Sequence, residues 1–199
     1  MYYPFFLFSL CVNAFRWLLC RLLIDSSQRL QSQSQKGNDG FTARNNSQAY
    51  FCRSLALAYI ELTVLDRFVT LLREGKDGEP VPADLVQVLV RIAALFGLWS
   101  LEKHLTSLYQ GGYISGSEPP KMIREAILQL CYELKDDAVA LVDAIAPTDF
   151  ILNSPITRSD GQIYKNLYSA MIQGPNALER PTYWKEFVDK PVIGSKSKL

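Results

Sequence analysis

Apolar side chains recur every three or four residues along most of the chain after residue 47, which is the spacing of one face of an α-helix. The first run of this kind goes from Phe51 to Leu72 in alternating steps of four and three residues. No stretch of useful length alternates apolar and polar residues as a half-buried β-strand would. The pattern therefore predicts an all-α protein.

Glycine and proline divide this pattern into separate helices. Gly75 and Gly78 end the first helix, and Pro82 marks the start of the second, because proline is tolerated in a first helical turn. Pro147 ends the third, and Asp160 is the expected N-cap of a shorter fourth helix. We expect a helical bundle of three long helices and one short helix. The expected helices cover approximately 51–72, 82–108, 119–146 and 161–172.

Charge and composition exclude several classes of protein. The 199 residues include 21 Lys and Arg against 20 Asp and Glu, so no excess of positive charge favours nucleic acid as a partner. Four cysteines are too sparse for a disulfide scaffold, and a single histidine leaves no good zinc ligand set. The length suits one domain, which excludes a complete large multi-domain enzyme.

The first 46 residues differ in kind from the rest. Residues 2–24 are strongly apolar, and residues 26–40 are rich in Ser and Gln, with little to bury. Such a polar stretch is typical of a flexible linker. We therefore expect residues 1–46 to form a poorly ordered or membrane-associating extension, and residues 47–199 to form the helical domain.

Three interpretations of the apolar segment 2–24 remain open. A signal peptide would have a basic region before the apolar run and a small-residue cleavage site, and neither is evident. A transmembrane helix fits the length, but Arg16 and Arg21 would each cost about 2.5–3.5 kcal/mol on insertion. The third interpretation is an amphipathic or aggregation-prone extension.

No residue pattern in the chain marks a catalytic or metal site. His104 is the only histidine, and no nucleophile-elbow motif accompanies any serine. The carboxylates of Glu133, Asp136, Asp137 and Asp143 follow one helix, but Lys135 lies among them, which favours a solvated charged face. We assign no catalytic residue and no metal ligand, and cofactor-binding residues stay unassigned.

The last three residues carry the most specific signal in the sequence. Ser197, Lys198 and Leu199 form the Ser-Lys-Leu tripeptide that addresses proteins to the peroxisome. A receptor reads it as a free C-terminus, with charge-assisted contacts to the lysine and the carboxylate and an apolar contact to the leucine. We therefore predict a peroxisomal location and an import receptor as partner.

Four blocks of sequence carry a resemblance to a known family. In order they read LALAYIEL, KDDAVALVD, DGQIYKNL and WKEF, at 55–62, 135–143, 160–167 and 184–187. Together with the terminal tripeptide, they resemble the C-terminal domain of peroxisomal acyl-CoA oxidases, and most closely that of the branched-chain (pristanoyl-CoA) type. The resemblance covers residues 47–199, and residues 1–46 do not share it.

This resemblance implies an FAD enzyme of fatty-acid β-oxidation. In that family a glutamate removes the α-proton of an acyl-CoA and flavin accepts the β-hydride, and oxygen then reoxidises the flavin, which yields trans-2-enoyl-CoA and H2O2. The segments that bind flavin and acyl-CoA and supply the base have no counterpart here. Glu61 and Glu133 lie in or beside matching blocks, but neither falls in the motif of the base.

Two hypotheses of function follow. In the first, the chain is the C-terminal portion of an acyl-CoA oxidase, it is inactive alone, and acyl-CoA binds only to the full enzyme. In the second, it is a non-enzymatic module that pairs with itself or with a full-length oxidase subunit. FAD belongs to the family in both cases, and we do not expect this chain alone to bind it. Membrane contact through residues 2–24 is a further possible interaction.

Overall fold

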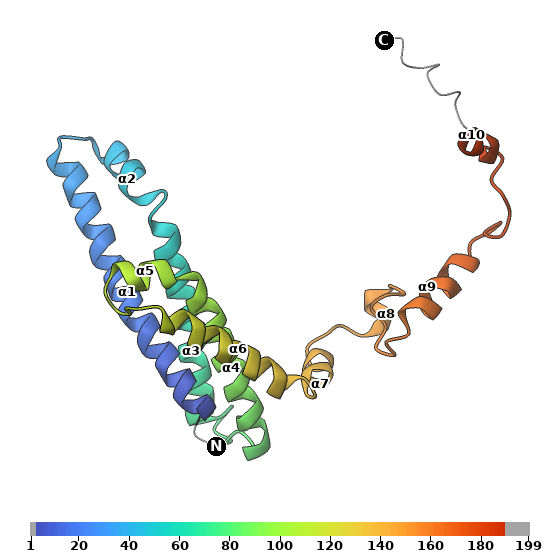
Figure 1. Cartoon of the computed structure of the whole chain (residues 1–199), viewed down its shortest axis with the longest axis horizontal. Coiled ribbons are helices and arrows are strands. Elements are labelled where there is room, and N and C mark those ends of the chain that lie inside the picture. Colours follow the sequence, from blue (N-terminus) through green and yellow to red (C-terminus); the bar gives the residue numbers. More distant parts are fainter. Residues whose placement is uncertain (1–2, 190–199) are drawn as a thin grey trace, which may run out of the picture. The chain divides into compact units, whose positions relative to one another are not determined.

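A computed structural model describes residues 3–189, and all its regular elements are helices (Figure 1). The only β pairing among these residues is an isolated bridge between Lys76 and Glu79. The chain divides into two compact units, residues 1–138 and residues 139–199, here called the bundle unit and the tail unit. The bundle unit contains α1 (Tyr3–Gln35), α2 (Gly40–Gln48), α3 (Cys52–Glu74), α4 (Ala83–Lys103), α5 (Leu105–Gln110) and α6 (Glu118–Leu134). The tail unit contains α7 (Ala138–Asp143), α8 (Asp149–Leu152), α9 (Ile163–Ile172) and α10 (Trp184–Val188).

The all-α prediction is confirmed, and three of the four expected helices correspond to α3, α4 with α5, and α9. The expected third helix is interrupted at residues 135–137, and so falls into α6 and α7. The fourth begins at Ile163, and the Asp160 carboxylate accepts hydrogen bonds from the Gln162 backbone and the Asn166 amide. These bonds hold the pKa of Asp160 below its ordinary value, the Gln162 N–H being the main cause. Helices α1, α2, α8 and α10 were not predicted.

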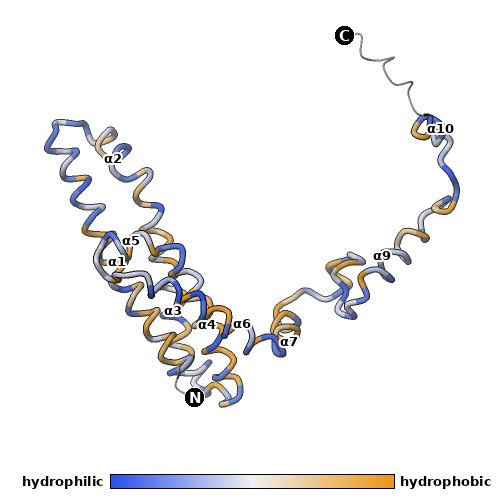
Figure 2. Tube along the Cα trace, viewed as in Figure 1, coloured by the Kyte–Doolittle hydropathy of each residue, from blue (hydrophilic) through white to orange (hydrophobic). Residues whose placement is uncertain are grey.

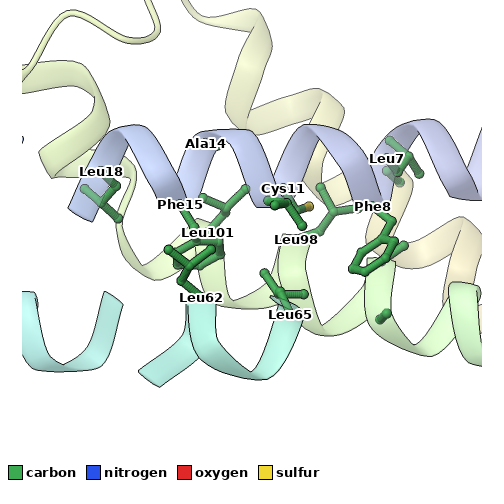
Figure 3. Packing of buried hydrophobic residues seen from close by; sticks show 14 of the residues in the cluster. Leu7, Phe8, Cys11, Ala14, Phe15, Leu18, Leu62, Leu65, Leu98 and Leu101 are labelled. Carbon is green, nitrogen blue, oxygen red and sulfur yellow. The ribbon is translucent and has the colours of Figure 1, made fainter. Parts of the chain in front are cut away.

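The prediction of a poorly ordered extension over residues 1–46 is wrong for the described part of that segment. α1 is a 33-residue helix, about 50 Å long at 1.5 Å per residue, and it packs against α3 and α4. One face of it is buried at steps of three and four residues (Figure 3). These buried residues are Leu7, Phe8, Cys11, Val12, Ala14, Phe15 and Leu18. The apolar segment therefore forms part of the core of the bundle unit.

The two arginines that would oppose membrane insertion lie on the exposed side of α1. Arg16 pairs with Asp66 of α3 at 2.9 Å, and Arg21 pairs with Asp25 one turn along α1 at 3.2 Å. Both pairs are partly exposed to solvent, so each stabilises the fold by only about 0–1 kcal/mol. The two pairs show how α1 is oriented: its charged side faces solvent, and its apolar face is left to pack in the core.

The Ser/Gln-rich stretch is not a linker over most of its length. α1 continues through it to Gln35, and after a short turn Asp39 caps α2. Ser26 is buried between the two helices, where its hydroxyl donates to Gln48 Oε1 at 2.8 Å and its carbonyl accepts from Gln48 Nε2 at 3.1 Å. Polar residues can be buried here because these hydrogen bonds satisfy them.

The core of the bundle unit lies where α1, α3, α4 and α6 meet. Leu62 and Leu65 of α3 and Leu98 and Leu101 of α4 face the buried side of α1 (Figure 3). Gly97 of α4 lies directly against Cys11 of α1, since a Cβ at that position would come within 2.8 Å of the Cys11 Cβ. Only glycine allows α1 and α4 to approach this closely without a shift.

Helix α4 ends at His104 and α5 begins directly after it, so the predicted continuous helix has a break. The His104 N–H bonds to the carbonyl of Leu101, which is a tightened final turn. Gly112, at φ 76°, lies in the left-handed region and follows the end of α5. The break turns α5 toward the middle of α1, where Gly111 contacts Trp17.

The tail unit has almost no core of its own. Among residues 139–189 only Asn166 is fully buried. Many large apolar side chains of this unit are exposed, including Ile145 (86%), Phe150 (92%) and Leu178 (85%). Apolar stretches along α7 and α9 are visible in Figure 2. Apolar side chains exposed to this extent within one unit are typical of a surface that packs against another surface.

Two of the described helices, α1 and α4, are long and apolar enough to cross a membrane by length and composition alone. In each, 39% of the most apolar window is buried inside the protein. Core helices of globular proteins satisfy the same criterion, and α1 and α4 pack against each other in the core.

The burial of α1 predicts the effect of two matched substitutions. Leu18 is fully buried and Leu23 of the same helix is 51% exposed. We expect Leu18→Ala to lower the free energy of unfolding by about 2–5 kcal/mol, and Leu23→Ala by less than about 0.5 kcal/mol. Urea unfolding followed by circular dichroism measures both. Equal effects of the two substitutions would contradict a core position for α1.

Candidate functional site

The residues with the clearest predicted role, Ser197, Lys198 and Leu199, lie outside the described residues. Of the remaining candidates, His104 and Glu61 lie at or beside the break between α4 and α5, and the acidic residues lie on or after α6. His104 lies at this break and is buried. Nε2 of His104 donates to Glu61 Oε2 of α3 across 2.6 Å, since a carboxylate only accepts. Its ring and that of Phe15 of α1 make a T-shaped contact, with the ring centroids 5.8 Å apart.

Each of the two glutamates that the sequence singled out contacts a basic side chain in the structure. Glu61 is bound to His104, and its side chain is largely buried. Glu133 of α6 lies 3.2 Å from Arg91 Nε and accepts a hydrogen bond from Gln129. Glu61 thus joins α3 to the α4–α5 break in the interior, and Glu133 joins α6 to α4 at a partly exposed position.

The acidic residues that follow α6 do not come together. Asp136 and Asp137 lie in the turn after α6, and Asp143 ends α7. Within residues 3–189 there is no group of three or more His, Cys, Asp or Glu side chains that could hold a metal ion.

The four cysteines are free thiols in different surroundings. Cys20 and Cys131 are exposed, and Cys52 donates to Gln48 Oε1 at 2.9 Å. Cys11 is fully buried against Gly97, and this burial raises the pKa of its thiol to about 12. A thiol held neutral in this way is chemically inert and contributes packing.

The most developed cavity of the bundle unit is a cleft of about 630 Å³. We call it the α1–α5 cleft, because α1 and α5 form its long walls and the start of α3 closes it. Its lining contains three basic side chains, one carboxylate, two aromatic rings and several hydroxyl and amide groups. The principal ones are Arg21, Asp25, Arg29, Tyr50, Phe51, Ser54, Lys103, His104, Thr106, Ser107 and Gln110.

The lining of this cleft does not fit a flavin ring. The reactive ring of a redox cofactor needs a pocket that excludes water and is lined mainly by apolar groups. The α1–α5 cleft is instead bordered by exposed charged side chains such as Arg29 and Lys103. This cleft therefore offers no slot for the redox ring.

The tail unit has a separate cleft of about 530 Å³, lined by residues of α8, α9 and the loop between them. Asn166 anchors one side of it, because its amide donates to Asp160 at 2.8 Å. Asp149 fixes the loop by accepting from the backbone N–H and the hydroxyl of Ser159. This network orders a polar loop, and it offers no pair of groups suited to proton transfer.

Sequence reasoning missed the α1–α5 cleft because it assigned Arg21 and Arg29 to an extension and a linker. The signal was present, since Arg21, Asp25 and Arg29 are spaced by four residues and so share one face of a helix. The helical period continues through the polar stretch at these positions. Tyr50 and Phe51, at the predicted domain boundary, close the same cleft.

Comparisons with known proteins find related sequences along nearly the whole chain. The acyl-CoA oxidase family model matches residues 8–194. Human peroxisomal acyl-coenzyme A oxidase 3 is 49% identical over 193 residues, and acyl-coenzyme A oxidase acox-3 of Caenorhabditis elegans is 35% identical over 188. These matches cover 96% and 93% of this chain but only 27% of either relative. The chain thus spans about a quarter of the length of the curated relatives it matches.

A solved structure shows the same fold. The crystal structure of acyl-CoA oxidase 3 from Yarrowia lipolytica superposes with a TM-score of 0.74 over 96% of this chain and 28% of that one, at 17% identity. The family match begins at residue 8 and so includes most of α1. The expectation that residues 1–46 lie outside the resemblance is therefore wrong.

The buried thiol of Cys11 predicts a loss of stability in alkaline solution. The pKa of the Cys11 thiol in the folded state, about 12, lies above its ordinary value of 9.0, so the folded state binds the proton more tightly. The stability that depends on the neutral thiol is complete below about pH 9, and it falls as the pH rises toward 12, by at most about 1.4 kcal/mol per pH unit.

Urea unfolding between about pH 8 and pH 10.5 tests this linkage, with Cys11→Ala as the variant and Cys131→Ala, at an exposed position, as its control. Cys11→Ala should have a shallower alkaline decline than the wild type, and Cys131→Ala the same decline as the wild type. Parallel curves for all three proteins would contradict the assignment.

Proposed function

Because the chain belongs to the acyl-CoA oxidase family, we propose that it is the C-terminal portion of a peroxisomal, FAD-dependent acyl-CoA oxidase. Such an enzyme converts acyl-CoA and O2 to trans-2-enoyl-CoA and H2O2. The family match over residues 8–194, together with 49% identity to human peroxisomal acyl-coenzyme A oxidase 3, carries the proposal. The resemblance of the sequence to the branched-chain (pristanoyl-CoA) type favours 2-methyl-branched acyl-CoA as substrate of the full enzyme.

In this proposal the chain supports the reaction and does not perform it alone. The family is FAD-dependent in general, and FAD supplies the hydride acceptor when it is bound. The α1–α5 cleft offers no slot for its redox ring, and the two glutamates that the sequence singled out, Glu61 and Glu133, contact His104 and Arg91. The role of this chain is to provide a rigid helical body against which the flavin-binding and substrate-binding parts of an oxidase pack.

The purified 199-residue chain should therefore bind no stoichiometric flavin and release no peroxide. Visible flavin absorbance, and a peroxide-coupled assay with straight-chain and 2-methyl-branched acyl-CoA, measure both properties. Human peroxisomal acyl-coenzyme A oxidase 3 is the positive control. Stoichiometric FAD together with turnover by this chain would contradict the supporting role.

The exposed apolar surface of the tail unit favours a second proposal, that the chain acts as an interaction module. A unit of about 60 residues with one fully buried residue cannot be stabilised by its own core. Its apolar side chains require a covering surface, from a full-length oxidase subunit or from a second copy of this chain. An interaction through these side chains does not require that the chain take part in catalysis.

Size-exclusion chromatography with light scattering tests the association, on the chain alone and mixed with the human oxidase. We expect a dimer or a complex with the oxidase, and we expect Phe150→Asp to weaken it because Phe150 is 92% exposed. Lys121→Asp on α6, at an exposed polar position of the bundle unit, is the matched control. A monomer that does not bind the oxidase would contradict the module proposal.

The proposed location rests on the Ser197-Lys198-Leu199 tripeptide and on the peroxisomal names of the human and rat relatives. The import receptor is the partner that this signal implies. A fluorescent protein fused ahead of Met1 leaves the C-terminus free. Deletion of Leu199 should then change peroxisomal puncta to diffuse fluorescence, and unchanged puncta would contradict the assignment.

A further inference from the structure

The lining of the α1–α5 cleft has the character of a ligand site. Its volume of about 630 Å³ lies within the range of 300–1,000 Å³ that small-molecule sites occupy. Three separate parts of the chain form it, namely α1, the α2–α3 junction with the start of α3, and the region from the end of α4 through α5. Nothing in the proposed oxidase role assigns it a function.

Positive charge is concentrated in this cleft. Arg21, Arg29 and Lys103 line it, and Asp25 is the only carboxylate among the lining residues. Residues 1–138 as a whole carry equal numbers of acidic and basic side chains, so the excess is local. A cleft lined by one sign of charge raises the local concentration of ions of the opposite sign.

The terminal N–H donors of the two arginines are largely free among the described contacts, whereas the Lys103 ammonium lies over the Trp99 ring, 3.3 Å from its centroid. Arg21 uses its Nε to bind Asp25, which leaves its two terminal amino groups without a described partner. The Arg29 guanidinium lies over the Phe51 ring at 3.8 Å and has no described hydrogen bond. A guanidinium held flat in this way presents its donors in the fixed geometry that suits phosphate oxygens.

Neutral donors add to this set. The side chains of Ser54, Thr106, Ser107 and Gln110 line the cleft, and no described hydrogen bond engages them. Hydroxyl and amide groups placed beside cations orient a polar ligand more closely than charge alone. His104 forms part of the floor, where its Nε2 is already bound to Glu61.

An exposed aromatic ring borders the cleft. Tyr50 is 81% exposed, and it meets Phe51 in a T-shaped contact at 5.2 Å between the ring centroids. The face of a tyrosine ring that is open to solvent stacks favourably on planar heterocycles, by about 1–3 kcal/mol per base in nucleic-acid complexes. The cleft thus combines an anion-binding side with a stacking surface.

We propose that the α1–α5 cleft binds a small organic phosphate that carries a planar ring. Arg21, Arg29 and Lys103 hold the phosphate, and the ring stacks on Tyr50. Binding is non-covalent and does not rest on the proposed oxidase role, because every residue named lies in the bundle unit of this chain.

Isothermal titration calorimetry on the 199-residue chain tests the proposal, with AMP as probe because it combines one phosphate with one planar ring. Adenosine and inorganic phosphate are the two comparison arms. We expect AMP to bind at one site per chain, and each comparison compound to bind at least about tenfold more weakly. The affinity for AMP should fall with added NaCl, as expected for a phosphate held by cations.

Four variants locate the site. Arg29→Gln and Lys103→Met should each weaken AMP binding about tenfold, and Tyr50→Ser should weaken binding of AMP but not of inorganic phosphate. Arg44→Gln, at an exposed position on α2 outside the cleft, should change nothing. Circular dichroism melts confirm that each variant is folded. Absence of AMP binding at millimolar concentration, equal affinity for AMP and inorganic phosphate, or unchanged binding by Arg29→Gln would overturn the proposal.

Discussion

The close approach of α1 to α4 is the contact on which the bundle unit depends. At Gly97 the two helices come so near that a Cβ would lie 2.8 Å from Cys11 Cβ and 2.9 Å from its sulfur. This proximity brings Phe15 and Leu18 of α1 into the space between α3 and α4, where both are fully buried. Protein interiors are packed closely, so a shift at this point would disturb every layer of the core. The same placement of α1 puts Arg21 and Arg29 opposite α5, and so determines the α1–α5 cleft.

The helices from residue 51 onward could be predicted from the sequence because their period and their end signals are both local. The positions of Pro82 and Gly75 were enough to place the α3–α4 turn. α1 could not be placed in this way, because an apolar segment looks the same whether lipid or protein covers it. Tertiary contacts decide between lipid and protein. α3 and α4 bury one face of α1, and on the other face Arg16 donates a hydrogen bond to Asp66.

The candidate site shows the same division between local and tertiary information. The sequence offered no partner for His104, because its bond to Glu61 joins residues 43 positions apart and has no local signature. The cleft is similar, because its cations come from α1 and from the end of α4. The helical break at His104, which turns α5 toward α1, has no glycine or proline to mark it. Packing of the Phe15 edge against the imidazole accompanies this break.

The position of α1 along the chain has a consequence for biosynthesis. α1 leaves the ribosome before α3 and α4, the helices that bury its apolar face, and roughly 70 residues must follow Gln35 before α4 is complete. At about 5–20 residues per second this interval lasts on the order of several seconds. During it one face of α1 lacks the surface of α4 that covers it in the folded bundle, and exposed apolar surface of this kind is the condition in which nascent chains aggregate or recruit chaperones.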